Sequence, residues 1–162
     1  MSNIGRRLKD HWESHDLECD PGVSDHSLEA FERRYDVALP CDMREYFSVV
    51  NGTGHVRDEP VETGTEQLYD EEFFSFWPLE LVRPLKQDSP EVDVEQFESL
   101  FLFADHSIWC PAFAIALSKD RTVTNRVINV YVSPGVVTVG RQVSNSFTEF
   151  VEAYIQDHFS LH

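Results

Sequence analysis

The spacing of apolar residues changes along the chain, from a helical period before residue 51 to a strand pattern after residue 99. Near the start, Ile4, Leu8 and Trp12 recur every fourth residue and would form a narrow apolar stripe on one helix face. That helix must end before Pro21, because proline lacks a backbone N–H and interrupts helical hydrogen bonding. We therefore expect residues 1–22 to form an N-terminal helical extension.

Two further helices are expected before residue 51. Ser24 or Asp25 can cap the first of them, because a side-chain oxygen there accepts a hydrogen bond from a free backbone N–H. The second would begin at Leu39-Pro40, since proline suits the first helical position, and would end through a left-handed residue at Asn51-Gly52. The predicted apolar faces are Leu28, Phe31 and Tyr35 in the first helix and Met43, Tyr46, Phe47 and Val50 in the second.

Strand patterns occupy much of the second half. Residues 73–76 are expected to form a short strand, which Trp77-Pro78 and a helical turn around residues 79–85 would follow. Residues 100–103 are all apolar, as expected for a strand covered on both faces. In residues 112–117 three bulky side chains alternate with alanines, so the alanine face could admit a helix at close range. Further strands are expected at residues 127–132 and 136–139, joined by a turn at Pro134-Gly135.

The clearest helix is the last one. Residues 146–149 read Ser-Phe-Thr-Glu, a capping box, and five apolar residues from Phe147 to Ile155 follow with helical spacing. Helices, then neighbouring strands, then a helix predict an α+β fold with a largely antiparallel sheet, flanked by the N-terminal helices and the C-terminal helix. A length of 162 residues favours a single domain over residues 1–162.

Acidic residues are concentrated in one quarter of the chain. The sequence has 29 acidic and 13 basic residues, a net charge of −16, and residues 58–98 contribute −11 of it. Such an excess repels phosphate backbones and anionic membrane surfaces, so we expect neither nucleic acid nor a membrane as partner. Residues 53–72 have no apolar period and are predicted to form a long acidic loop.

The cysteines and the N-terminal residues indicate in which cellular compartment the protein is expected. Three cysteines lie far apart, which argues against a disulfide framework and suits a reducing cytosol. The first residues lack the apolar stretch of a secretory signal, and no apolar run approaches the roughly 20 residues of a membrane span. We expect a soluble, cytoplasmic protein; its oligomeric state is left open.

His11, His15 and Cys19 are four residues apart, so one continuous helix could align three types of metal ligand. Cys19, however, falls where the helix should end, and no fourth ligand for a tetrahedral zinc site is evident. Asp70-Glu71-Glu72 could hold a divalent cation or supply paired carboxylates, but no calcium-binding loop surrounds them. We predict no metal and no cofactor.

No set of catalytic residues is apparent. Asp105-His106-Ser107 contains the residue types of a catalytic triad, but adjacent residues of an extended chain point to opposite faces. Cys41 or Cys110 would need an electropositive setting to act as a nucleophile, and Cys110 is interpreted as a small buried residue beside Trp109. We expect no enzymatic activity, and an enzyme of unrecognised type is the third possibility.

A protein-binding surface is the hypothesis that remains. Charge steers two proteins toward each other, so a concentrated acidic segment favours a basic protein partner. The neighbouring aromatic residues 73–77 are interpreted as part of the core. The predicted contact residues are Asp58, Glu59, Glu62, Glu66, Asp70, Glu71 and Glu72.

Five motifs in order resemble the SUKH superfamily, which is named partly after Smi/Knr-type regulators. They are Leu28–Tyr35 with Leu39–Phe47 and Asn51-Gly52, then Phe76–Glu80, Leu102–Trp109, Ala112–Leu117 and Ser146–Val151. The resemblance covers roughly residues 25–157. It implies an α+β domain without a known catalytic site. It also implies an immunity protein that neutralises a toxin, often a nuclease, or alternatively a regulatory or scaffolding module without a toxin partner.

Overall fold

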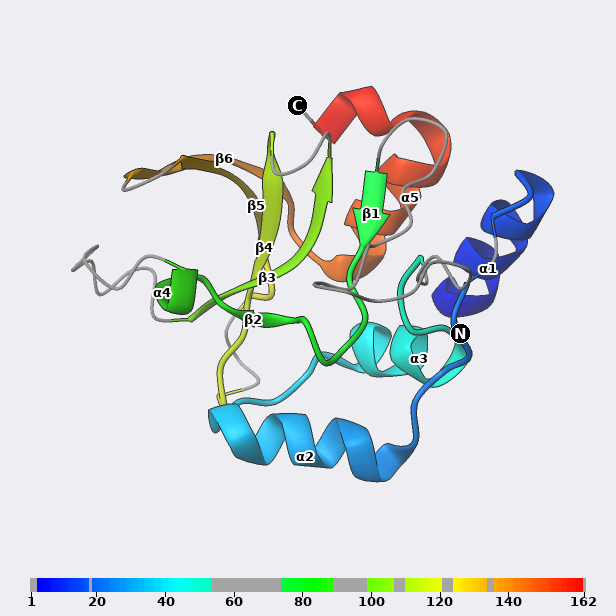
Figure 1. Ribbon diagram of the computed structural model, residues 1–162, viewed down its shortest axis with the longest axis horizontal. Coiled ribbons are helices and arrows are strands. Elements are labelled where there is room, and N and C mark those ends of the chain that lie inside the picture. Colours follow the sequence, from blue (N-terminus) through cyan, green and yellow to red (C-terminus); the bar gives the residue numbers. More distant parts are fainter. Residues whose placement is uncertain are drawn as a thin grey trace, which may run out of the picture.

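Strand β3 (Leu100–His106) pairs with three other strands, with β1 and β2 along one edge and β4 along the other. The computed structural model describes residues 3–17, 19–53, 74–88, 99–106, 110–120, 124–133 and 136–161. In this part of the chain a six-stranded sheet has the order β1-β3-β4-β5-β6, with β2 also paired to β3 (Figure 1). Every pairing is antiparallel, so the predicted α+β fold with an antiparallel sheet is confirmed.

The elements follow the order expected from the apolar spacing. The helices are α1 (Ile4–Ser14), α2 (Asp25–Tyr35), α3 (Cys41–Val49), the short α4 (Leu85–Asp88) and α5 (Phe147–Asp157), with a final 3₁₀ turn η2 (His158–Leu161). The other strands are β1 (Phe74–Phe76), β2 (Arg83–Pro84), β4 (Ala112–Ala116), β5 (Val127–Ser133) and β6 (Val136–Ser144).

The two faces of the sheet bury different side chains. The face toward α1, α2, α3 and α5 carries large residues, among them Phe101, Phe103 and Phe113. The other face carries Leu100, Leu102 and the three alanines of β4. The prediction that residues 100–103 are covered on both sides is therefore confirmed.

The cover of the alanine face differs from the prediction. The residues buried with the alanines include Trp77 and Leu85, from the stretch after β1 and the four-residue helix α4. The indole N–H of Trp77 donates to the buried carboxylate of Asp105 at 2.6 Å, and the Arg83 guanidinium lies over the same ring. The alanine face of β4 is therefore covered by the Trp77 ring together with Leu85 of the short helix α4, and not by a long helix.

Both ends of α3 and the segment after residue 78 differ from the prediction. Pro40 occupies the N-cap position of α3, and Cys41 is the first helical residue. The helix does not end in a left-handed residue: Val50 is extended and forms a β-bridge with Pro21, while Gly52, with φ +83°, comes later. The helical turn expected around residues 79–85 is instead a turn, then β2, then α4. At Val50 and at β2, pairing with a distant segment overrides the local preference.

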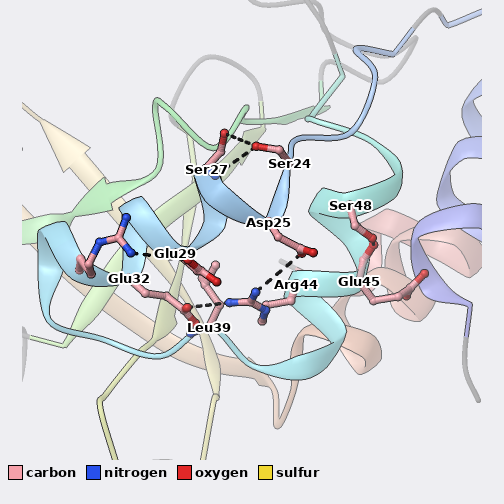
Figure 2. A network of polar contacts seen from close by, with 10 residues as sticks. Ser24, Asp25, Ser27, Glu29, Glu32, Leu39, Arg44, Glu45 and Ser48 are labelled. Carbon is pink, nitrogen blue, oxygen red and sulfur yellow. Dashed lines mark hydrogen bonds and ion pairs between the residues drawn. The ribbon is translucent and has the colours of Figure 1, made fainter.

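Polar side chains of helix α3 bind each of the helices α1, α2 and α5. Glu45 accepts a hydrogen bond from the backbone N–H of Gly5 at the start of α1, at 3.2 Å. Asp42 accepts from the backbone N–H of Thr148 at the start of α5, at 2.8 Å. Figure 2 shows the side of α3 that faces α2, where Arg44 donates to Glu32 at 2.6 Å. Carboxylates suit these places because helix N-termini carry unpaired N–H groups and partial positive charge.

The N-terminus of α5 is capped almost as predicted. Ser146 Oγ accepts from the backbone N–H of Glu149 at 3.1 Å, which is half of the capping box. The Glu149 carboxylate reaches one residue further back than expected and accepts from the backbone N–H of Asn145 at 2.8 Å. This hydrogen bond, with a second from the Asn145 side chain, lowers the pKa of the Glu149 carboxyl below its usual range.

Asn51 and Thr53 join the end of α3 to the chain around β1. Asn51 Oδ1 accepts from the backbone N–H of Leu79 at 2.8 Å, and its side-chain amide donates to Glu80 at 3.2 Å. The backbone N–H of Thr53 donates to the carbonyl of Phe76 at 3.0 Å. We call these three hydrogen bonds the α3–β1 joint.

We expect Asn51→Ala to lower the free energy of unfolding by about 2 kcal/mol, because the buried N–H of Leu79 loses its acceptor. Urea unfolding followed by circular dichroism measures the change. Asn125→Ala is the control, since Asn125 is half-buried and donates one bond to Ala116, so its loss should cost about 1 kcal/mol or less. Equal effects of the two substitutions would contradict the importance of the joint.

Candidate protein-binding surface

The seven carboxylates predicted to contact a partner lie outside the described residues. They are Asp58, Glu59, Glu62, Glu66, Asp70, Glu71 and Glu72. The described residues on either side of them, Thr53 and Phe74, are both fully buried. Thr53 lies against β1, with its hydroxyl 3.3 Å from that of Ser75. The two residues that flank this part of the sequence, Thr53 and Phe74, therefore lie together at the edge strand β1.

An acidic hollow lies next to this place. It has a volume of about 450 Å³ and separates the end of α1 from the end of α3. Glu13, Asp16 and Asp20 line it, against one base, Lys9, whose ammonium is 3.6 Å from Glu13. The remaining wall is largely apolar and consists of Leu17, Cys19, Pro21, Val49 and Val50. Carboxylates around an apolar wall are suited to a lysine or arginine side chain, whose stem is apolar and whose head is charged.

Sequence reasoning missed this acidic hollow. Its carboxylates come from α1 and the residues after it, whereas Val49 and Val50 come from the end of α3 about thirty positions later. No period in the sequence joins these two segments. The backbone bond from Asn51 N–H to the carbonyl of Asp20 brings them together.

A second hollow, of about 350 Å³, lies between α2 and the turn after β1. Phe31, Leu79 and Val82 contribute apolar surface, and Arg34 and Glu80 contribute opposite charges. It could accept an apolar side chain, but its charges favour no particular kind of partner.

The histidines considered as metal ligands are neighbours on α1. The rings of His11 and His15 are 4.6 Å apart between centroids, and His15 Nδ1 lies 2.8 Å from the carbonyl of His11. Cys19 is half-buried, and burial raises the pKa of its thiol, which disfavours the thiolate that a metal needs. Within the described ranges, no three His, Cys, Asp or Glu side chains are grouped as a metal site.

The residues weighed as catalytic are not brought together. Asp105 is fully buried and accepts from Trp77, and His106 lies at the end of β3. Ser107 lies outside the described residues. The prediction that Cys110 is buried was wrong: Cys110 is exposed in the turn after β3, and Pro111 takes the buried position beside it. Cys41 is also exposed.

Tyr46 is a buried titratable group that is not part of any candidate site. It is 1% exposed, and its hydroxyl lies near the backbone N–H of Gly52, in a geometry too poor for a full hydrogen bond. Burial raises the pKa of this phenol far above its ordinary value. Its ring packs against Phe47 and Phe147, so the side chain serves the core.

Two comparisons with known proteins and one property of the helices complete the description. A family model described as the SMI1 / KNR4 family (SUKH-1) matches residues 22–153, well over half of the chain. No curated protein matches the chain significantly. Among the described residues, no helix has the length and apolar character that a membrane span requires.

We expect Tyr46→Phe to raise the free energy of unfolding at neutral pH by up to about 1 kcal/mol, because only a poor contact with the Gly52 N–H compensates for burial of the hydroxyl. The pKa of Tyr46 is raised in the folded state, so this residue favours folding fully below about pH 10, the pKa of an unfolded tyrosine. That contribution is lost as the pH rises further, because only the unfolded chain releases the proton.

The alkaline fall in stability should therefore be smaller in Tyr46→Phe than in the wild type. Urea unfolding at several pH values between about 7 and 11 measures both effects. A variant that is less stable than the wild type at neutral pH would show that the hydroxyl has a stabilising partner.

Proposed function

The chain belongs to the SMI1 / KNR4 family (SUKH-1), and from this premise we propose that it is a non-enzymatic module that binds a basic protein. The family match over residues 22–153 carries the proposal, because membership fits a binding module. More specifically, the chain acts as an immunity protein: it binds a cognate toxin, such as a nuclease, and blocks the surface with which the toxin holds its substrate.

The distribution of charge supports a basic partner. The described residues hold 17 of the 29 acidic residues and 11 of the 13 basic ones. The remaining segments therefore hold twelve acidic residues and two basic ones, a net charge of −10. A nuclease binds phosphates through lysine and arginine, so a surface of carboxylates can occupy the same groups.

The acidic hollow supports the location of the contact. The residues that flank the acidic segment 54–73 lie together beside β1, and the hollow starts from Val49 and Val50, a few residues before that segment. The acidic segment and the hollow together form a binding face: the segment supplies long-range attraction, and the hollow receives one basic side chain. Interfaces commonly depend on one such anchor residue in a pocket.

The free thiols support a cytoplasmic location for the protein. Cys19, Cys41 and Cys110 are free, and two of them are exposed. Exposed free thiols persist in a reducing compartment, so we place the protein in the cytoplasm.

We expect the triple substitution Asp70→Asn, Glu71→Gln, Glu72→Gln to slow association with a basic toxin partner by roughly tenfold at low salt, since surface charge mainly sets the association rate. Stopped-flow fluorescence against the product of the adjacent gene measures the rate. Most of the difference should vanish at high salt, because at 1 M the Debye length falls to about 3 Å.

The matched control is the triple substitution Glu91→Gln, Asp93→Asn, Glu95→Gln, which removes the same charge elsewhere in the acidic quarter. The double substitution Glu13→Gln, Asp16→Asn tests the hollow and should act mainly on dissociation. If the control triple slows association and the first triple does not, the contact face is wrong. If none of the three changes binding, the basic-partner proposal fails.

A further inference from the structure

The two edges of the sheet differ in how well they are protected. One edge carries β1 and β2, of three and two residues, and β2 includes Pro84. The other edge is β6, of nine residues, which within the described residues is paired on one side only, with β5 (Figure 1). Short strands and proline block further pairing, whereas a long free edge presents unpaired N–H and C=O groups.

The regular part of β6 lacks protective side chains. Residues Val136–Val139 pair in register with Ser133–Val130 of β5, and the register shifts only beyond Val139. At Gly140 a Cβ would overlap the side-chain oxygen of Asn129, so a larger residue there would require the Asn129 side chain to move. Residues 136–139 read Val-Val-Thr-Val, with high strand propensity and no charge or proline to deter a further strand.

Exposed apolar side chains gather at the same place. In the described part of the chain the exposed large hydrophobic residues are Tyr131, 42% exposed, and Val136, 59% exposed. Both belong to the β5–β6 hairpin, and Tyr131 is paired directly with Thr138. We call Tyr131, Val136 and Thr138 the hairpin patch.

Charge restricts what can cover the hairpin patch. Residues 124–148 contain Arg126 and Arg141 and no acidic residue, in a chain with a net charge of −16. The patch therefore offers no carboxylate to a basic partner. A second copy of this chain would bring carboxylates against carboxylates at acid-bearing faces, but not at this hairpin.

We propose that the edge of β6 pairs antiparallel with β6 of a second copy, so that two sheets join into one across a two-fold axis. Antiparallel pairing of identical strands is self-complementary: where a residue of one copy faces a given residue of the second, the reverse pair also forms. With the axis at Thr138, the two Thr138 side chains face each other and each Val136 approaches Gly140 of the second copy. The blunt β1–β2 edge cannot continue the sheet, so assembly stops at a dimer.

Sedimentation equilibrium tests the dimer at about 100 µM protein, well above a micromolar dissociation constant. A reductant is present because Cys41 and Cys110 are exposed and could otherwise form disulfides. We expect a mass of twice the chain's 18.7 kDa. Thr138→Glu and Thr138→Lys should each raise the dissociation constant at least tenfold, because like charges then face each other. An equimolar mixture of the two variants should associate again.

Ser48→Glu and Ser48→Lys are the controls, since Ser48 is exposed on α3, a helix on another side of the molecule from β6 (Figure 1), and both should remain dimers. Circular dichroism verifies that each variant is folded. Added salt should tighten the dimer, since it screens repulsion between two chains of −16, whereas it should weaken binding of a basic partner. The opposite signs keep failure of this proposal distinct from failure of the proposed function.

Three results would overturn the dimer proposal. One is a monomeric wild type at about 100 µM in about 0.5 M salt, where repulsion is largely screened. Another is a Thr138→Glu and Thr138→Lys mixture that stays monomeric although each variant is folded. The third is a dimer that the Ser48 substitutions disrupt and the Thr138 substitutions leave intact.

Discussion

The α3–β1 joint connects the helices to the sheet. It consists of the hydrogen bonds that join Asn51 to Leu79 and Glu80, and Thr53 to Phe76. The cover of the sheet and the place of the acidic hollow both depend on it. These hydrogen bonds set the position of Trp77, which covers the alanine face of β4 that no long helix reaches. They also bring the residues that flank the acidic segment 54–73 together beside β1. The acidic hollow between α1 and α3 lies next to the same point, because Asn51 also binds Asp20. One joint thus serves both the fold and the proposed binding face.

The sequence predicts the helices and strands well, because one-sided burial leaves a local period. Leu28 and Phe31 on α2 and Phe150 and Tyr154 on α5 are buried as expected. The prediction for Cys110 failed at a local turn, in which its N–H donates to the His106 carbonyl and its side chain is exposed. The prediction for Val50 failed because a distant segment decides the outcome, since Val50 pairs with Pro21. The acidic hollow could not be predicted for the same reason, since its walls meet only in the folded chain. The predicted contact carboxylates lie outside the described residues and stay a prediction.

The two proposed surfaces respond to salt in opposite ways. Carboxylates of the acidic segment and hollow would attract a basic partner, and this attraction weakens as salt screens it. The β6 hairpin carries arginines and no acidic residue, so association there is limited mainly by repulsion between whole chains and strengthens with salt. If both proposals hold, each dimer carries two copies of the proposed binding face, because β1 and β6 lie at opposite edges of the sheet.

Co-expression with the product of the adjacent gene, followed by purification and assay of that product, tests the central claim most directly. The account predicts a stoichiometric complex in which the partner is basic and its toxic activity is blocked, and which dissociates as ionic strength rises. It would be contradicted by a partner that stays fully active in the complex. A complex whose affinity does not change with salt, or catalytic turnover by this chain alone, would contradict it equally.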